Sequence, residues 1–284
     1  MPEVCEIVVT THFLMSELKN KNIVSLNILS GRYTHQELEG ENLITKYSPL
    51  KILDINSKGK FMWFELYSEK HNKHIYIMNT FGLSGSWGFN NENSSRISLS
   101  ITDNKKNKFR SLYYNDPRNF GTIKITDDPI NLNNKLNKLA PDLLKTEYSL
   151  GEFKKWFIDY KYQNREIIKV LMNQEIGTGI GSGLGNYLAP EILYRSKISP
   201  YRTINSLTNI DLANLYNEMR KTLKLCYLSN HVGYMTQFED YIEQHKIDVD
   251  KGILPNFQKK VKLKKMTDSI FLFIKEKKIL WEMT

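Results

Sequence analysis

The sequence predicts an α+β fold in which an N-terminal helix and an antiparallel β-sandwich precede a mainly helical domain. Three changes in the apolar pattern support this interpretation. Apolar residues recur every three or four positions over residues 2–18, which is typical of an amphipathic helix. They then alternate with polar residues in short segments up to about residue 127. Helical spacing returns after about residue 130 and continues through most of the remaining chain.

The first predicted element is the helix over residues 2–18. Pro2 suits the start of a helix, where no amide hydrogen is needed. Glu3 and Glu6 lie near the positive end of the helix dipole, where carboxylates are stabilised. The apolar stripe consists of Val4, Ile7, Val8, Thr11, Leu14 and Leu18.

Short strands separated by Gly, Asn and Asp follow the helix. We expect them at residues 24–28, 61–67, 75–78, 97–101, 112–114 and 122–125. Together with the helix they form a predicted first domain over residues 1–127.

A polar stretch over residues 126–134 leads into the second region. Helical spacing occurs at residues 136–144, 153–160, 166–173, 187–195 and 207–228. We therefore expect a linker with a connecting helix over 128–149 and a helical domain over 150–284. The end of the chain, 259–284, returns to apolar alternation with lysines and predicts a hairpin.

Composition and charge limit the class of protein. The chain has 284 residues, enough for two domains with sizeable cores. Lys and Arg total 40 against 31 Asp and Glu, and this surplus weakly favours a polyanionic partner. No stretch is apolar and long enough to span a membrane, and no basic-then-apolar signal opens the chain. We expect a soluble intracellular protein with no membrane partner.

The cysteine and histidine content argues against a metal site. Cys5 and Cys226 are the only cysteines, too few for a disulfide framework or a four-cysteine zinc site. His71 and His74 stand three apart without a further ligand cluster, and we interpret them as surface residues of a hairpin turn. We therefore expect no metal and no other cofactor.

Five segments of the chain resemble the motifs of the Fpg/Nei DNA glycosylases. The opening reads Met-Pro-Glu-Val-Cys-Glu, and residues 57–61 read Ser-Lys-Gly-Lys-Phe. Residues 81–86 read Phe-Gly-Leu-Ser-Gly-Ser, and 114–121 read Tyr-Asn-Asp-Pro-Arg-Asn-Phe-Gly. The longest match, 181–195, resembles the family's helix–two-turns–helix and reads Gly-Ser-Gly-Leu-Gly-Asn-Tyr-Leu-Ala-Pro-Glu-Ile-Leu-Tyr-Arg. The motifs most resemble those of the Nei-like branch, especially those of its giant-virus members that lack a zinc finger.

The resemblance implies four catalytic candidates in the first domain. Pro2 would be the nucleophile once Met1 is removed, because a secondary amine forms an iminium with an opened sugar. An α-amine of pKa about 7.7–8 is also partly unprotonated at neutral pH. Glu3 would protonate the sugar ring oxygen, with Glu6 as the weaker candidate. Lys60, after a glycine in a strand, would bind phosphates around the lesion. The alternatives are a helix-start proline, acids that complement the helix dipole, and a solvated lysine.

The resemblance also implies DNA-binding residues. Leu83, Arg118 and Phe120 would fill the space left by a flipped nucleotide, although a core role for Phe120 stays open. Amides of the glycine-rich turn, among them Gly185, and the side chain of Asn186 would bind phosphate.

The expected function is that of a bifunctional DNA glycosylase and AP lyase acting on damaged DNA as a monomer. The substrates would be oxidised pyrimidines and ring-opened purines, with 8-oxoguanine as the alternative lesion. The compartment, whether nucleus, cytoplasm or viral factory, stays open.

Two departures from the family pattern leave room for a catalytically silent binder of abasic or branched DNA. Val4 and Cys5 replace a glycine and a proline beside the nucleophile, and no arginine follows Arg220 to serve a zinc-less finger. A basic RNA-binding module is a third alternative, but the sequence has no stacking-rich binding signature.

Overall fold

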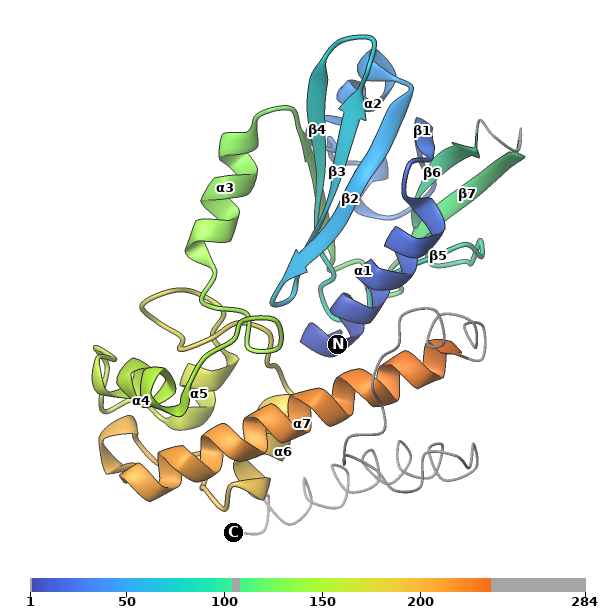
Figure 1. Ribbon diagram of the computed structural model, residues 1–284. Helices are drawn as coiled ribbons and strands as arrows, with labels where there is room; N and C mark the ends of the chain where they lie inside the picture. The colour runs from blue at the N-terminus through green and yellow to red at the C-terminus, as the bar shows by residue number, and fades with distance from the viewer. Residues whose placement is uncertain (1, 104–107, 236–284) are drawn as a thin grey trace.

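The computed structural model describes residues 2–103 and 108–235 (Figure 1). Its helices are α1 (Val4–Leu18), α2 (Glu41–Tyr47), α3 (Pro129–Lys138), α4 (Leu150–Ile158), α5 (Ile167–Met172), α6 (Leu188–Arg195) and α7 (Asn209–Met235). Its strands are β1 (Asn22–Ile28), β2 (Leu50–Lys58), β3 (Phe61–Ser68), β4 (Lys73–Thr80), β5 (Ser86–Gly88), β6 (Ser95–Asp103), β7 (Lys108–Asn115) and β8 (Thr122–Thr126). The order of elements confirms the predicted α+β class.

The strands form one antiparallel sheet in the order β5-β7-β6-β1-β2-β3-β4-β8. Its two halves meet where Asn22 and Ile23 of β1 pair with Lys51 and Leu50 of β2, and Asn20 N–H donates to Ile52 O beside them. Buried residues from both halves, such as Ile52, Leu66, Leu99 and Leu112, share one apolar core. The two layers expected of a sandwich are therefore connected by a short ladder at one edge.

Helix α1 contributes to two cores. Ile7 and Leu14 pack into the core of the sheet. Val4, Cys5 and Val8 belong instead to the core of the helical domain. The helix contacts both β2 and α7, and Figure 1 shows it between the sheet and the long α7. The first turn of α1 is thus built into the second domain.

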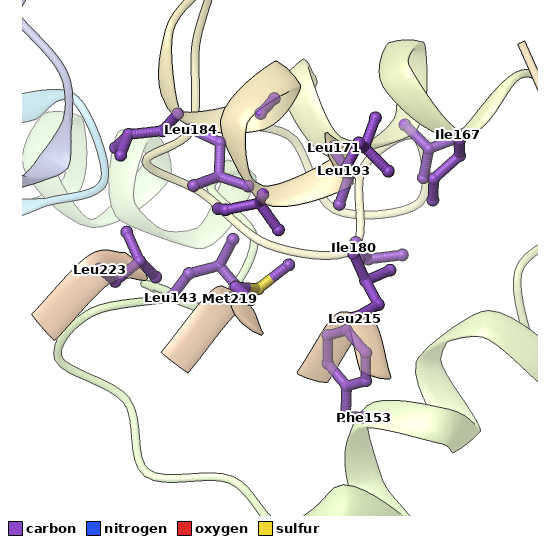
Figure 2. Close-up of a cluster of buried hydrophobic side chains, with 14 of the residues drawn as sticks. Leu143, Phe153, Ile167, Leu171, Ile180, Leu184, Leu193, Leu215, Met219 and Leu223 are labelled. Atoms are coloured by element: carbon purple, nitrogen blue, oxygen red, sulfur yellow. The ribbon is translucent and has the colours of Figure 1, made fainter. Parts of the chain in front are cut away.

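The helical domain packs α4 and α6 against α7, and α5 packs against α6. Side chains from these elements and from the loop before α6 meet in one cluster, as Figure 2 shows. The labelled members are Leu143, Phe153, Ile167, Leu171, Ile180, Leu184, Leu193, Leu215, Met219 and Leu223. Among the described residues, no helix is long and apolar enough to cross a membrane.

The helix predicted over 136–144 is wrong. Helix α3 begins earlier, because Asp128 caps it by accepting the N–H of Ile130 and Pro129 occupies its first turn. It ends at Lys138, and the following residues run as irregular chain whose amides bind the glycine-rich loop before α6. The N–H of Ala140 donates to Gln174 O and that of Leu143 to Ser182 O.

Other expectations fall on surface turns or outside the described chain. His71 lies in the turn between β3 and β4, and His74 follows on β4 with Nδ1 3.1 Å from Glu65 Oε1. No cluster of metal-binding side chains occurs within residues 2–103 and 108–235. The hairpin predicted at 259–284, with its lysines, lies beyond the described residues. The domain boundaries at 127 and 149 stay predictions.

Candidate active site and DNA-binding loops

A cavity of about 570 Å³ lies where the sheet meets the helical domain. Pro2 and Lys60 line it, so the structure brings together two of the predicted catalytic residues. The remaining wall comes from both domains and consists of Phe61, Thr80, Phe81, Gly82, Lys135, Leu139, Met172, Asn173, Gln174 and Glu175. The position next to Pro2 can therefore receive a group from solvent.

Glu3 is completely buried beside Pro2, at the N-cap of α1. Its carboxylate accepts the backbone N–H groups of Gly185 at 2.6 Å, Tyr187 at 3.0 Å and Leu188 at 3.3 Å. Burial raises the pKa of Glu3 to about 7, although the amide hydrogen bonds and the charge of Lys60 oppose the shift. A carboxyl group of this pKa can hold or release a proton near neutral pH.

Lys60 stands in the turn between β2 and β3, which corrects the expectation that it lies within a strand. Gly59 precedes it with φ +57°, and a Cβ there would lie 2.7 Å from the Ser182 Cβ. The turn is therefore pressed against the glycine-rich loop, and Lys60 Nζ donates to Leu184 O at 2.9 Å. Burial lowers the pKa of Lys60, while the nearby Glu3 carboxylate opposes this shift.

Glu6 does not line the cavity. Its carboxylate accepts the backbone N–H of Glu3 at 2.9 Å, the hydroxyl of Tyr187, and Asn230 Nδ2 at 3.2 Å. With Glu3 it forms a reciprocal capping box at the start of α1. The geometry gives Glu6 a role in holding the first turn rather than contact with a ligand in the cavity.

Val4 and Cys5 also point away from the cavity, into the core of the helical domain. Val4 N–H donates to Gly183 O at 3.1 Å, and a Cβ on Gly183 would lie 2.7 Å from the Val4 Cβ. Cys5 Sγ donates to Leu223 O at 3.6 Å. The two residues that depart from the family's opening are therefore packed in this core, and neither lines the cavity.

The loops that carry the predicted void-filling residues are tied together at their bases. Ser84 Oγ donates to Asp116 Oδ1 at 2.6 Å and accepts the N–H of Arg118 at 3.1 Å. Leu83 is half-buried, whereas Arg118 is exposed. Phe120 is 57% exposed, which makes the core role wrong for this side chain.

In the glycine-rich turn before α6, some groups bind α1 and others face solvent. The N–H of Gly185 is taken by Glu3, so it is not free to bind phosphate as expected. The side chain of Asn186, the next residue, is exposed. The motifs do not predict Tyr187 as a site residue, although its position directly after Gly185 and Asn186 could have indicated a role at the site.

Comparison with known proteins identifies two domains of one family in this chain. The formamidopyrimidine-DNA glycosylase N-terminal domain matches residues 1–123, and the H2TH domain of the same family matches 139–234. The formamidopyrimidine-DNA glycosylase of a Wolbachia pipientis strain is 28% identical over 228 residues, covering 78% of this chain and 77% of the relative.

Two solved structures share the fold. The MutM (Fpg) protein of Thermus thermophilus gives a TM-score of 0.62 at 23% identity, over 81% of this chain and 77% of that one. A mutant of the Lactococcus lactis enzyme in complex with DNA containing Fapy-dG gives 0.65 at 19% identity, over 81% and 79%. With two domains of one family matched over most of its length, the chain belongs to the formamidopyrimidine-DNA glycosylase family, whose members are DNA glycosylases with AP lyase activity.

Proposed function

We propose that this protein is a bifunctional DNA glycosylase and AP lyase whose nucleophile is the amine of Pro2, freed by removal of Met1. The observation that carries the proposal is the joint placement of Pro2 and Lys60 on one cavity, with the buried Glu3 next in the chain. A nucleophile, a cation and an acid of pKa about 7 are the groups that the reaction needs.

The reaction begins when the damaged nucleotide leaves the duplex and enters the cavity. The nitrogen of Pro2 attacks C1′ of the sugar, the bond from C1′ to the base breaks, and the departing base takes up the proton that the nitrogen loses. Glu3 gives its proton to the ring oxygen, the ring opens, and the nitrogen lone pair forms an iminium with C1′. Loss of a proton from C2′ then expels the 3′ phosphate, and a second elimination expels the 5′ phosphate. Lys60 would orient the phosphates around the lesion.

Damaged DNA is the proposed partner, bound between the two domains by a monomer. Oxidised pyrimidines and ring-opened purines are the proposed lesions, because we also propose that the protein belongs to the Nei-like branch. The Lactococcus lactis structure with Fapy-dG, a ring-opened purine, supports the second class. Leu83, Arg118 and Phe120 would support the duplex after flipping, and Asn186 would contact phosphate.

The deciding experiment traps the covalent intermediate. Tag-free protein is incubated with a duplex that contains an abasic site, in the presence of borohydride, which reduces an iminium to a stable amine. We expect a covalent protein–DNA adduct whose bond maps to Pro2. Binding without an adduct would instead support a silent binder of abasic DNA. A panel of duplexes with one oxidised pyrimidine, Fapy-dG or 8-oxoguanine then ranks the lesions by single-turnover rate.

A further inference from the structure

Tyr187 contacts both acids of the first turn of α1. It stands at the N-cap of α6, and its backbone N–H donates to Glu3 Oε1 at 3.0 Å. Its hydroxyl donates to Glu6 Oε1. One residue of the helical domain therefore holds the segment that carries the nucleophile by its main chain and by its side chain.

Glu6 transmits this contact to the peptide group beside the nucleophile. Its second oxygen, Oε2, accepts the N–H of Glu3 at 2.9 Å. Because a peptide group is planar, this hydrogen bond fixes the plane that joins Pro2 to Glu3. Only rotation about the Cα–C bond of Pro2 then remains to place its ring nitrogen.

The hydroxyl of Tyr187 lies in a polar cluster between α1, α6 and α7. Asn230 Nδ2 donates to Glu6 Oε1 at 3.2 Å, and Cys226 Sγ lies 3.6 Å from Tyr187 Oη. Burial raises the pKa of Tyr187, so the hydroxyl keeps its proton and remains a donor at neutral pH. A hydrogen bond to a carboxylate in such surroundings is strong and directional.

We propose that the hydroxyl of Tyr187, acting through Glu6, is a positioning group that orients the Pro2 amine for attack on C1′. The inference rests on the proposed function, because it takes Pro2 as the nucleophile. It assigns Glu6 the role of a link between helices instead of that of a proton donor. A displacement of about 1 Å at a reacting atom can cost about a hundredfold in rate, so a small rotation of the proline is measurable.

The test removes only the hydroxyl. Tyr187→Phe keeps the aromatic ring and the backbone N–H that binds Glu3. Borohydride trapping on a preformed abasic duplex is followed under single-turnover conditions over a range of enzyme concentrations. We expect the maximal trapping rate to fall about tenfold, while the half-saturating enzyme concentration and Tm match the wild type.

Tyr216→Phe is the matched control. It also removes a hydroxyl that donates within the helical domain, to Tyr148 O at 3.0 Å, and this hydrogen bond does not involve α1. We expect wild-type trapping rates for this variant. An equal loss of rate in Tyr216→Phe indicates a general effect of losing a hydroxyl in the helical domain and overturns the inference.

Glu6→Gln breaks the same link from the other end, and it keeps the test decisive if Tyr187→Phe folds poorly. We expect it to slow trapping as well, and the double variant to lose no more than Glu6→Gln alone. Fully additive losses, or equal rates for Tyr187→Phe and wild type, overturn the inference. A wild-type protein that forms no adduct overturns the proposed function and the inference together, whereas adduct formation unaffected by either substitution overturns the inference alone.

Discussion

The first turn of α1 and the paired loops around Leu83 and Arg118 differ in how hydrogen bonds hold their residues in place. Around Glu3, three backbone amides bind the carboxylate, and the capping box with Glu6 holds the start of the helix. The paired loops are joined at their bases through Ser84 and Asp116, and they carry Arg118 and Phe120 exposed to solvent.

This difference matches the tasks proposed for the two regions. A group that forms a bond with C1′ must sit within a few tenths of an ångström of its productive position. Side chains that enter a DNA duplex must stay accessible until the DNA arrives, and their backbone needs support only at the base of each loop. Substitutions in the first turn should therefore change the chemistry on every substrate, and those in the loops only the handling of duplex DNA.

The largest expected effect comes from Pro2→Gly, which exchanges the secondary amine for a primary one and releases the backbone. We expect base excision to fall by about a hundredfold or more, with some lyase activity retained by the primary amine. Excision and strand cleavage are measured separately on a gel, with tag-free protein. Unchanged excision by this variant, or by a protein with an N-terminal tag, would remove Pro2 from the mechanism.

Glu3→Gln should have the next largest effect, about a hundredfold on excision, because the amide cannot give a proton to the sugar. In the wild type the excision rate should decline above about pH 7 as Glu3 loses its proton, and the variant should lack this decline. Single-turnover rates from pH 5 to 9 check the prediction. A wild-type profile that keeps rising above pH 7 in step with the amine would contradict it.

The same pKa predicts how stability depends on pH. Between about pH 4.5 and 7 the folded protein keeps a proton on Glu3 that the unfolded chain has lost. The contribution of this group to the free energy of unfolding therefore falls as the pH rises through that window, and stays at its lowest value above it. Chemical denaturation of wild type and Glu3→Gln at several pH values should show a smaller decline in the variant; parallel curves would argue against a raised pKa.

Arg118→Ala tests the loops, and we expect an effect of about tenfold on duplex substrates. Flipping leaves a gap in the stack whose formation takes a few kcal/mol, and the guanidinium is proposed to stabilise it. The same lesion in single-stranded DNA has no stack to open and should be excised at nearly the wild-type rate. Melting curves serve as the control. Equal losses on both substrates, with a lower Tm, would make Arg118 a structural residue.

The smallest expected effect is that of Asn186→Ala, a few-fold loss of DNA affinity that is similar for all sequences. A phosphate contact carries no base information, and because the Asn186 amide is uncharged, the slope of log affinity against log salt should stay at its wild-type value. Binding titrations at several salt concentrations measure both quantities. Unchanged affinity would exclude Asn186 from the phosphate contacts.

Periodicity predicts the elements whose pattern is regular. Helix α1 has an uninterrupted apolar stripe, and β6 alternates along its whole length, so both are found. Strand β2 is missed because its register shifts between Ile52 and Asp54, and this irregularity breaks the period of two. Helix α3 is placed too late because its start depends on the Asp128 cap and Pro129, within a stretch that composition alone assigns to a linker.

The members of the candidate site could be named from motifs, but their contacts could not. Glu3 and the amide of Gly185 are 182 positions apart, so only the fold shows that the glycine-rich turn serves the acid of α1. The directions of Val4 and Cys5 depend likewise on which core the first turn enters. No motif indicates that the capping box of α1 extends to Tyr187 and Asn230 on two other helices.

The placement of α1 in two cores has a consequence for how the protein can be divided. Val4 and Val8 pack with the helical domain, while Ile7 and Leu14, on the same helix, pack with the sheet. A fragment that ends near residue 127 would retain Pro2, Glu3 and Lys60 in its sequence and lose the surface against which their geometry is set. We therefore expect the two halves to unfold together. Neither an exchanged second domain nor separate expression of the first should yield an active enzyme unless the interface along α1 is rebuilt as well.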